Sequence, residues 1–418
     1  MRNASRTARS AMAIGAVIAT GLLAVASSAG ARGHRHHHHH MSGGLNISSV
    51  PWGTANGQEV NLYTLRNAHG MKVRITNYGG VVQSIWVPNR HGRLANVALG
   101  FSNLSDYVND FQNQPWPASG GSGDTYFGAI IGRYANRIAG AKFTLNGTTY
   151  GLGGGPHSCG TTATPNNGPN LLHGGPDSYN TKVWTATTQQ GAHSVALQLT
   201  YTDPDCYNGF PGTVQNTVTY TLNNKDELGI HYGATTDKPT VVNFTNHTYF
   251  NLAGEGSGDV LHQKLRINAD TYTPVDANLI PTGVLAPVAG TPFDFRHLKA
   301  IGKDIRDSNE QLQIAHGYDH NWVLNGSGLR TAAFAEDPHS GRTLTTLTTE
   351  PGVQFYTGNF LVGDLVGTSG HAYRQTDGFT LETQHFPNSP NQPSFPSTVL
   401  NPGQTFSSTT VYRFGVAR

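Results

Sequence analysis

Charged side chains are scarce in this sequence. Only 12% of the 418 residues are Asp, Glu, Lys or Arg, and 27 basic residues nearly balance 25 acidic ones, for a formal net charge of +2. Proteins that bind nucleic acid or anionic lipid concentrate Lys and Arg on one face, because attraction to phosphate supplies much of their affinity. The composition therefore indicates neither nucleic acid nor a membrane surface as a partner.

Cysteine is rarer still. The two cysteines, Cys159 and Cys206, have no neighbouring Cys or His ligands, so their spacing does not indicate a zinc site. In an oxidising compartment they could form one disulfide, and in a reducing compartment they would stay as two free thiols. The sequence leaves both alternatives open.

The N-terminal segment has the features of an export signal. Arg2, Arg6 and Arg9 precede an uncharged apolar run over residues 11–25, and the small residues Ala29-Gly30-Ala31 follow. The run is shorter than the about 20 residues that a membrane span needs. We expect residues 1–31 to be a signal peptide of a secreted or periplasmic protein that keeps no stable membrane association after cleavage. An uncleaved anchor is the alternative.

Residues 32–44 form a His-rich segment. Five consecutive histidines occupy residues 36–40, just before Met41. The segment is either an expression tag or a natural linker with weak metal affinity. In both cases it cannot build a core, so we place it outside the fold.

Long amphipathic helices are missing after the signal segment, and only residues 301–314 could hold a short helix. Apolar residues instead occupy every second position over 71–76, 195–202, 218–222 and 230–232. This alternation predicts half-buried strands, because successive side chains of a strand point to opposite faces. With 51 Gly and 22 Pro marking frequent turns, the chain is predicted to be all-β, a large sandwich.

Residues 45–418 show no linker and no shift in composition, so we predict a single domain there. Two stretches interrupt the strand pattern. Residues 151–169 are rich in Gly, Pro, Thr and Asn, and residues 119–124 are rich in Gly and Ser. We expect both to be surface loops beside a functional site.

Six short segments combine polar and aromatic residues: 132–137, 170–175, 246–252, 317–321, 354–359 and 381–387. Local rules would not place Asn246-His247-Thr248-Tyr249 or Glu382-Thr383-Gln384-His385 inside a strand. Such local violations are expected at functional sites.

In this order, the six segments resemble the aldose 1-epimerase (galactose mutarotase) family. The similarity extends from Asn77-Tyr78-Gly79-Gly80 to the closing Thr409-Thr410-Val411-Tyr412-Arg413-Phe414. A single His-Gly-Gly or Asp-His-Asn would mean little, but six such segments in series are hard to obtain by chance. The resemblance implies a large antiparallel β-supersandwich, in agreement with the alternation. It also implies an enzyme that interconverts the α and β anomers of a free aldose, glucose or galactose, without metal or cofactor.

The resemblance also implies roles for individual residues. His247 matches the family's general acid and Glu382 its general base. The matching sugar-binding positions are Asn136, Arg137, His173, Tyr249, Asp319 and Gln354. These types suit the chemistry, because ring opening needs one proton removed from the C1 hydroxyl and one delivered to the ring oxygen.

Each of these residues taken alone has an ordinary structural explanation. A lone His is usually bonded to backbone, and a lone Glu is usually solvated or ion-paired. His320 and His385 lie in these segments and His316 directly precedes one of them, and we expect all three to be structural.

Three other functions compete with the epimerase hypothesis. A glycoside hydrolase needs two carboxylates about 5–5.5 or 6.5–9.5 Å apart, and Asp319 and Glu382 are the obvious pair. A sugar-binding module would not need both His247 and Glu382. A sugar-phosphate epimerase needs extra Lys or Arg side chains to bind the phosphate, and the motifs place only Arg137 and Arg133 near the site. Either a monomer or a dimer is compatible with the sequence.

Overall fold

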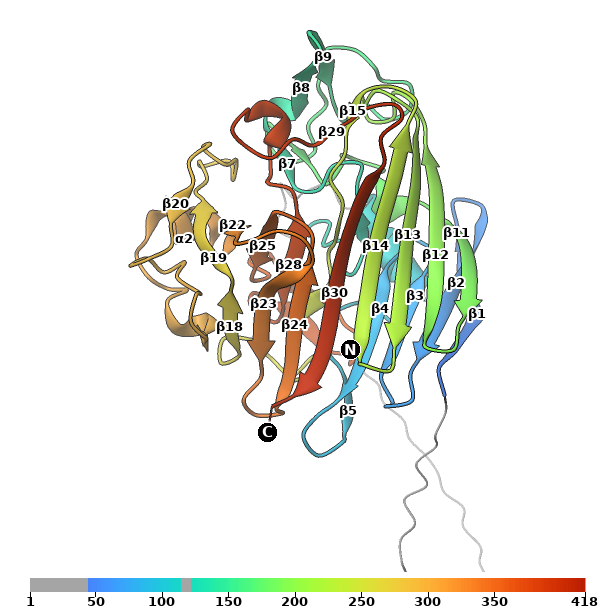
Figure 1. Cartoon of the computed structure of the whole chain (residues 1–418), viewed down its shortest axis with the longest axis vertical. Coiled ribbons are helices and arrows are strands. Elements are labelled where there is room, and N and C mark those ends of the chain that lie inside the picture. Colours follow the sequence, from blue (N-terminus) through green and yellow to red (C-terminus); the bar gives the residue numbers. More distant parts are fainter. Residues whose placement is uncertain (1–43, 114–121, 418) are drawn as a thin grey trace, which may run out of the picture. The chain divides into compact units, whose positions relative to one another are not determined.

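Nine antiparallel strands form the largest sheet of the computed structural model, which describes residues 44–113 and 122–417 (Figure 1). In spatial order the strands are β11 (Thr185–Gln190), β12 (Ser194–Asp203), β13 (Val214–Asn223), β14 (Glu227–Thr236), β30 (Phe406–Val416), β24 (Arg342–Thr348), β23 (Arg330–Glu336), β18 (Lys264–Ile267) and β21 (Lys299–Ala300). On β12, Val195, Leu197 and Leu199 are fully buried. The strands predicted from alternation are confirmed. Residues 1–31, predicted to be a signal peptide, and nearly all of the His-rich segment lie outside the described residues.

Two smaller antiparallel sheets share a core with this large sheet. The six-stranded sheet has the order β17 (Tyr249–Phe250), β28 (Phe379–Gln384), β25 (Gly352–Tyr356), β22 (Asp319–Leu324), β19 (Ala269–Thr273) and β20 (Ala286–Pro287). The five-stranded sheet runs in chain order through β1 (Asn46–Ala55), β2 (Gln58–Arg66), β3 (Lys72–Thr76), β4 (Val82–Pro88) and β5 (Leu94–Asn96).

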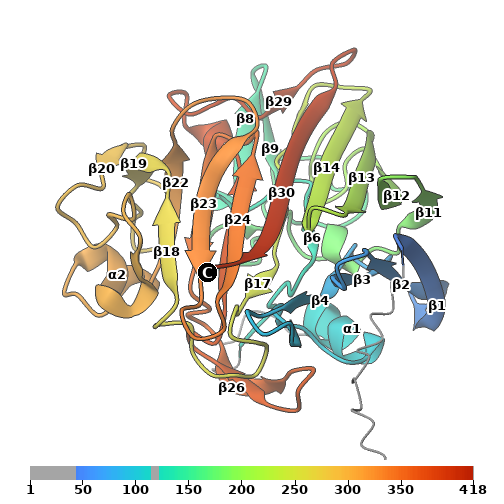
Figure 2. The same cartoon turned by 60° about the horizontal axis from the view of Figure 1, so that its bottom comes forward.

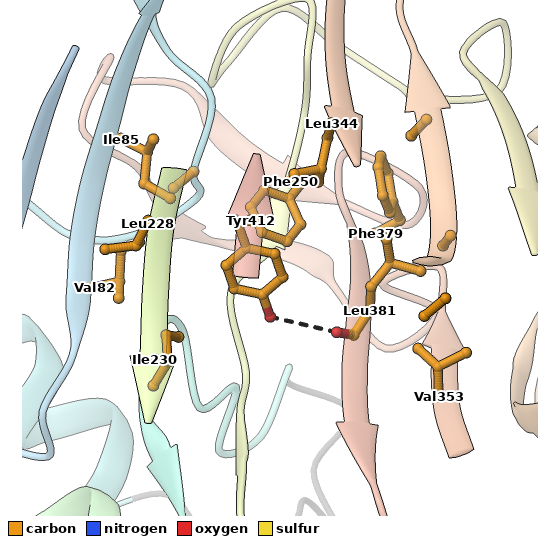
Figure 3. Packing of buried hydrophobic residues seen from close by; sticks show 14 of the residues in the cluster. Val82, Ile85, Leu228, Ile230, Phe250, Leu344, Val353, Phe379, Leu381 and Tyr412 are labelled. Atoms are coloured by element: carbon orange, nitrogen blue, oxygen red, sulfur yellow. Dashed lines mark hydrogen bonds between the residues drawn. The ribbon is translucent and has the colours of Figure 1, made fainter. Parts of the chain in front are cut away.

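Apolar side chains from all three sheets meet in one cluster. Figure 3 shows Val82 and Ile85 of β4 beside Leu228 of β14, and Tyr412 of β30 beside Leu381 of β28. The Tyr412 hydroxyl donates a hydrogen bond to the Leu381 carbonyl at 3.4 Å, so even the polar tip of this buried ring has a partner. Two small sheets on one large sheet confirm the predicted β-supersandwich.

Shorter elements join the sheets. Five two-stranded pairs are formed by β6 (Ile130–Ile131) with β16 (Thr245–Asn246), β7 (Arg137–Ile138) with β10 (Leu171–Leu172), β8 (Lys142–Leu145) with β9 (Thr148–Gly151), β15 (Thr240–Val241) with β29 (Val399–Leu400), and β26 (Val362–Val366) with β27 (Ala372–Arg374). The helices are α1 (Leu104–Asn113) and α2 (Glu310–Ala315), with single 3₁₀ turns at Ala139–Ala141, Tyr179–Thr181, Ile301–Lys303 and Ser389–Asn391. No helix among the described residues has the length and apolar character to cross a membrane.

The helices differ in part from the prediction. The expected helix over 301–314 is two pieces, a 3₁₀ turn and α2, whose N-cap Asn309 accepts a hydrogen bond from the Gln311 backbone. Helix α1 was not predicted. It lies beside the five-stranded sheet (Figure 2) and contacts β1 of that sheet. Its sequence is polar overall and carries Asn and Asp, which are poor helix formers, so tertiary contacts of Leu104, Tyr107 and Phe111 stabilise it.

The two predicted loops have different surroundings. Residues 151–169 connect β9 to β10, and Cys159 is joined to Cys206 by a disulfide with a Cα–Cα distance of 4.7 Å. Of the stretch 119–124, only 122–124 are described, and there the expected surface position is wrong. Ser122 is buried because its hydroxyl and backbone N–H both donate to the Asp364 carboxylate.

Candidate active site

Three adjacent strands of the six-stranded sheet carry polar side chains on one face. The register pairs Asp319 of β22 with Tyr356 of β25, and Gln354 of β25 with Glu382 of β28. Because side chains alternate along a strand, the intervening Phe355 and Leu381 point to the opposite face and join the apolar core. Glu382-Thr383-Gln384 therefore does lie inside a strand, contrary to our expectation. The alternation continues there, with the polar side facing a site instead of solvent.

A second group of site residues lies on the β7–β10 pair. Leu172 pairs with Arg137, which places His173 next to Asn136. The backbone N–H of His173 donates to the Asn136 carbonyl at 3.0 Å, and the backbone N–H of Asn136 donates to His173 Nδ1 at 3.1 Å. Both residues have a left-handed backbone, with φ of 62° at Asn136 and 52° at His173. Such conformations persist where the surrounding structure enforces them, as these reciprocal bonds do.

His247 lies between β16 and β17. Its backbone N–H donates to the Ala129 carbonyl at 2.9 Å, and its own carbonyl accepts from the Gly128 N–H at 3.0 Å. The imidazole is 5.1 Å from the His173 ring and 5.2 Å from the Tyr249 ring, measured between centroids. Backbone bonds on both sides of His247 thus fix the ring in an aromatic enclosure.

These groups surround a cavity of about 50 Å³. Its lining consists of Asp124, Tyr126, Asn136, Arg137, Leu172, His173, His247, Tyr249, Asp319, Tyr356, Phe360 and Glu382. The structure therefore brings together all of the predicted site residues except Gln354, which is not part of the lining. A larger cavity of about 840 Å³ shares Asp124, Tyr126 and Leu172 with it. Small-molecule sites usually measure about 300–1,000 Å³. The larger cavity has a volume in this range, and the smaller cavity holds the acidic and basic side chains.

Gln354 acts on the cavity through Asp319. Its side-chain amide donates to Asp319 Oδ1 at 2.7 Å. Asp319 Oδ2 lies 3.6 Å from the Arg137 guanidinium, whose Nε donates to Asn167 Oδ1 at 3.0 Å. Both oxygens of the Asp319 carboxylate are thus held in place, and charge-assisted contacts of this kind favour a fixed orientation.

His247 and Glu382 form a buried acid–base pair. His247 Nε2 is 3.4 Å from Glu382 Oε1, and the side chains are 6% and 2% exposed. Burial raises the pKa of Glu382 to about 8, although a hydrogen bond from Thr380 acts in the opposite direction. Burial also lowers the pKa of His247 to about 3. Near neutral pH the pair therefore holds one proton between its two members.

The environment of His173 fixes its tautomer. Its Nδ1 accepts the Asn136 backbone N–H, so the proton of a neutral ring is on Nε2. Burial lowers the pKa of His173 well below its usual range, and the charges of His247 and Arg137 add to the effect. His173 is therefore a neutral hydrogen-bond donor at the edge of the cavity.

The histidines expected to be structural have structural contacts. His320 Nε2 contacts Gln311 Oε1 at 3.2 Å, and His385 Nδ1 contacts Glu350 Oε2 at 2.7 Å. His316 caps the C-terminus of α2. Arg133, considered above as a cation near the site, instead donates from Nε to Asp203 at 2.7 Å and does not line the cavity.

Sequence reasoning missed five residues of the lining: Asp124, Tyr126, Leu172, Tyr356 and Phe360. Tyr356 could have been found, because it lies two positions after Gln354 on the same face of β25. Tyr126 packs edge-on against His173, with centroids 4.5 Å apart, in a left-handed backbone with φ of 55°. No local signal announces such a conformation at a Tyr.

Fold and cavity together define the class of this protein: a β-supersandwich whose cavity holds a buried histidine–carboxylate pair surrounded by polar side chains. The chain belongs to the aldose 1-epimerase family, whose model matches residues 61–413.

Individual relatives support this assignment. The chain is 41% identical to the galactose mutarotase of Rattus norvegicus over 366 residues, covering 87% of this chain and 96% of the relative. It is 38% identical to the aldose 1-epimerase of Escherichia coli K12 over 372 residues, covering 88% and 99%. Among solved structures, galactose 1-epimerase from Lactobacillus acidophilus matches with a TM-score of 0.74 and 28% identity, covering 90% of this chain and 100% of that one.

Proposed function

We propose that this protein is an aldose 1-epimerase that interconverts the anomers of a free aldose such as glucose or galactose. The observation that carries the proposal is the His247–Glu382 pair, with an acid and a base 3.4 Å apart in a cavity. The C1 hydroxyl oxygen and the ring oxygen of an aldose are bonded to the same carbon. One hemiacetal can therefore contact both members of the pair at once.

The reaction uses the proton that the pair shares. The pKa shifts place this proton on Glu382 in the resting pair. Once the proton has passed to His247 Nε2, the Glu382 carboxylate removes the proton of the C1 hydroxyl while the imidazolium protonates the ring oxygen. The C1–O5 bond breaks and C1 becomes an aldehyde. Rotation about C1–C2 presents the other carbonyl face, and the reverse transfers close the ring as the other anomer. Each general acid or base contributes a factor of about 10²–10⁴.

The remaining polar groups orient the sugar. Asp319 and Arg137 hold ring hydroxyls by charge-assisted hydrogen bonds. His173, a neutral donor at Nε2, stabilises charge developing on the ring oxygen without competing for the proton. The Tyr249 ring, beside His247, limits the position of the sugar plane.

The competing functions fit less well. A glycoside hydrolase needs two carboxylates at the reacting bond. Asp319, the second carboxylate, instead accepts a hydrogen bond from Gln354 and forms an ion pair with Arg137. A binding module has no use for a buried pair that shares a proton. A phosphorylated sugar would need a cation for its phosphate, but Arg133 forms an ion pair with Asp203 instead.

Polarimetry on freshly dissolved α-D-glucose and α-D-galactose tests the proposal. The purified protein should bring the optical rotation to equilibrium faster than buffer alone, and the faster sugar is the preferred one. Rates equal to the buffer rate for both sugars, and for other aldoses, would leave the proposal without support.

We also propose that the protein is exported. The support is the signal-like sequence of residues 1–31 together with the Cys159–Cys206 disulfide, a bond typical of oxidising compartments. Mass spectrometry of protein from the exporting cell should find an N-terminus near residue 32 and no alkylatable thiol. Retention of Met1 or two free thiols would contradict export.

The disulfide should act on stability more than on turnover. It closes a loop with a sequence separation of 47, which corresponds to about 4 kcal/mol in the chain-entropy description. Cys159→Ser should therefore lower Tm more clearly than kcat. A large loss of kcat at unchanged Tm would contradict this assignment.

A further inference from the structure

Away from the cavity, two histidines and a carboxylate converge at the edge of the nine-stranded sheet. His262 Nε2 is 3.1 Å from Asp337 Oδ1, and the His262 and His339 rings are 4.9 Å apart between centroids. One possible ligand atom of each residue lies within 4.8 Å of those of the other two. We propose that His262, Asp337 and His339 form a binding site for a divalent transition metal of the zinc class.

Strand register explains why these residues meet. β18 and β23 pair antiparallel and lie side by side in Figures 1 and 2, with Lys264 opposite Glu336. Because these strands are antiparallel, the turn before β18, which holds His262, lies beside the turn after β23, which holds Asp337 and His339. The convergence is therefore set by the backbone of the sheet and does not depend on a chance meeting of long side chains.

The turn between β23 and β24 is rigid enough to hold ligands. Asp337 N–H donates to the Arg342 carbonyl, and Gly341 N–H donates to the Asp337 carbonyl, both at 2.9 Å. Pro338 fixes its own φ between the two ligand positions. The Asp337 carboxylate is fully buried at its side chain and accepts the Ser340 backbone N–H on Oδ2 at 2.8 Å. Oδ1 accepts the His339 backbone N–H at 3.3 Å and contacts His262, and such support of a ligand is common around metal sites.

The donor set selects the class of ion. Imidazole nitrogen with one carboxylate suits zinc and its late first-row neighbours, whereas Ca²⁺ and Mg²⁺ prefer oxygen ligands. Zinc bonds of about 2.0–2.1 Å in a tetrahedron separate ligand atoms by about 3.3 Å. The 3.1 Å between His262 and Asp337 is close to this, and rotation of the exposed His339 ring completes three ligands, with water as the fourth.

A bound ion would stabilise the turn between β23 and β24, which holds the end of the segment 246–252 in place. Ser340 Oγ and Arg342 Nη1 donate to the Leu252 carbonyl at 3.2 and 3.0 Å. Leu252 ends the stretch that begins with His247. An ion that joins His262 to this turn would therefore raise thermal stability without contacting the cavity.

Zinc titration of the full chain tests the proposal, with residues 36–40 each replaced by Asn so that the N-terminal histidines do not bind the ion. Calorimetry should find a zinc site, and Tm should rise by about 3 °C at a zinc concentration 100 times Kd. His262→Ala with His339→Ala should weaken zinc binding at least about tenfold and remove the rise in Tm. His193→Ala, an exposed histidine elsewhere, is the matched control and should change neither.

Enzyme activity distinguishes this site from the cavity, where His173, His247 and Glu382 are also close together. Zinc at the proposed site, and its removal by EDTA, should leave kcat unchanged. A zinc-dependent rise in Tm that the double variant retains, or no rise in the starting protein, would overturn the proposal. So would zinc inhibition that the double variant abolishes, because zinc at the proposed site should not affect turnover.

Discussion

The segment of residues 382–385 begins and ends with a residue that forms a histidine–glutamate pair with a distant partner. Glu382 contacts His247 at 3.4 Å, whereas His385 contacts Glu350 at 2.7 Å. The His247 and His385 side chains are 6% and 22% exposed, and both carboxylates are nearly fully buried. Distance alone would select the His385–Glu350 pair as the stronger interaction, yet only the His247–Glu382 pair lines the cavity with Asp319 and Arg137.

The difference lies in hydrogen bonds that are left unmade. Glu382 Oε2 is buried without a hydrogen-bond partner among the described residues, while the buried polar atoms of Glu350 and His385 all have one there. A buried carboxylate oxygen in this state calls for a partner that the protein itself does not supply, such as a substrate hydroxyl or an ordered water. The His385–Glu350 pair lines a separate cavity of about 510 Å³, so it is the unpaired Glu382 oxygen that distinguishes the two pairs and leaves the His247–Glu382 pair able to bind a substrate hydroxyl.

Removing each histidine should give the largest contrast. His247→Ala should lower kcat about 10²–10⁴-fold, because the ring oxygen loses its proton donor. His385→Ala should keep kcat within about threefold but lower Tm, since it leaves Glu350 buried without its partner. Steady-state polarimetry and thermal unfolding measure both effects. Equal losses of kcat in the two variants would remove the distinction between the pairs.

A smaller effect is expected where the cavity binds without moving a proton. Asp319→Asn should raise KM about 10- to 100-fold, the equivalent of a hydrogen bond to a charged group, with a smaller change in kcat. Asp294→Asn, which breaks an ion pair with Arg296 outside the cavity, is the control and should alter neither constant. A loss confined to kcat would indicate that Asp319 takes part in proton transfer.

The smallest effect concerns pH. The His247–Glu382 pair keeps one proton until the pKa of Glu382, about 8, is passed, and above it no acid remains to protonate the ring oxygen. After subtraction of the buffer-catalysed rate, kcat/KM should fall about fivefold from pH 8 to pH 9 and about tenfold for each further pH unit. His385→Ala should leave this profile in place. A profile that is flat to pH 10 would show that the pair's proton is not used.

The sequence allowed prediction wherever structure follows from local alternation or from the family motifs. In β12, the alternating Val195, Leu197 and Leu199 specify the buried face, and all three side chains are buried there. His247 and Glu382 were identified by their segments, and the structure places them in contact. The same alternation continues through Glu382 and predicts a strand there, but the polar residues of the motif led us to expect an irregular segment.

Other features depend on contacts between distant segments. Asp124 and Tyr126 reach the cavity only because β6 pairs with β16, more than a hundred residues away. The Cys159–Cys206 bond required two loops to approach, which their compositions do not encode. Arg133 and Arg137 belong to one segment, yet one is held by Asp203 and the other lines the cavity.

Matched glutamate variants test the central claim most directly. Glu382→Gln and Glu350→Gln make the same chemical change in two buried histidine–glutamate pairs. The anomerisation rate of glucose or galactose, measured by polarimetry on folded protein, should fall about 10²–10⁴-fold for Glu382→Gln, because an amide cannot accept the C1 hydroxyl proton. Glu350→Gln should stay near the starting rate. Retention of more than about a tenth of kcat in Glu382→Gln, against that expected loss, would contradict the assignment of Glu382 as the base.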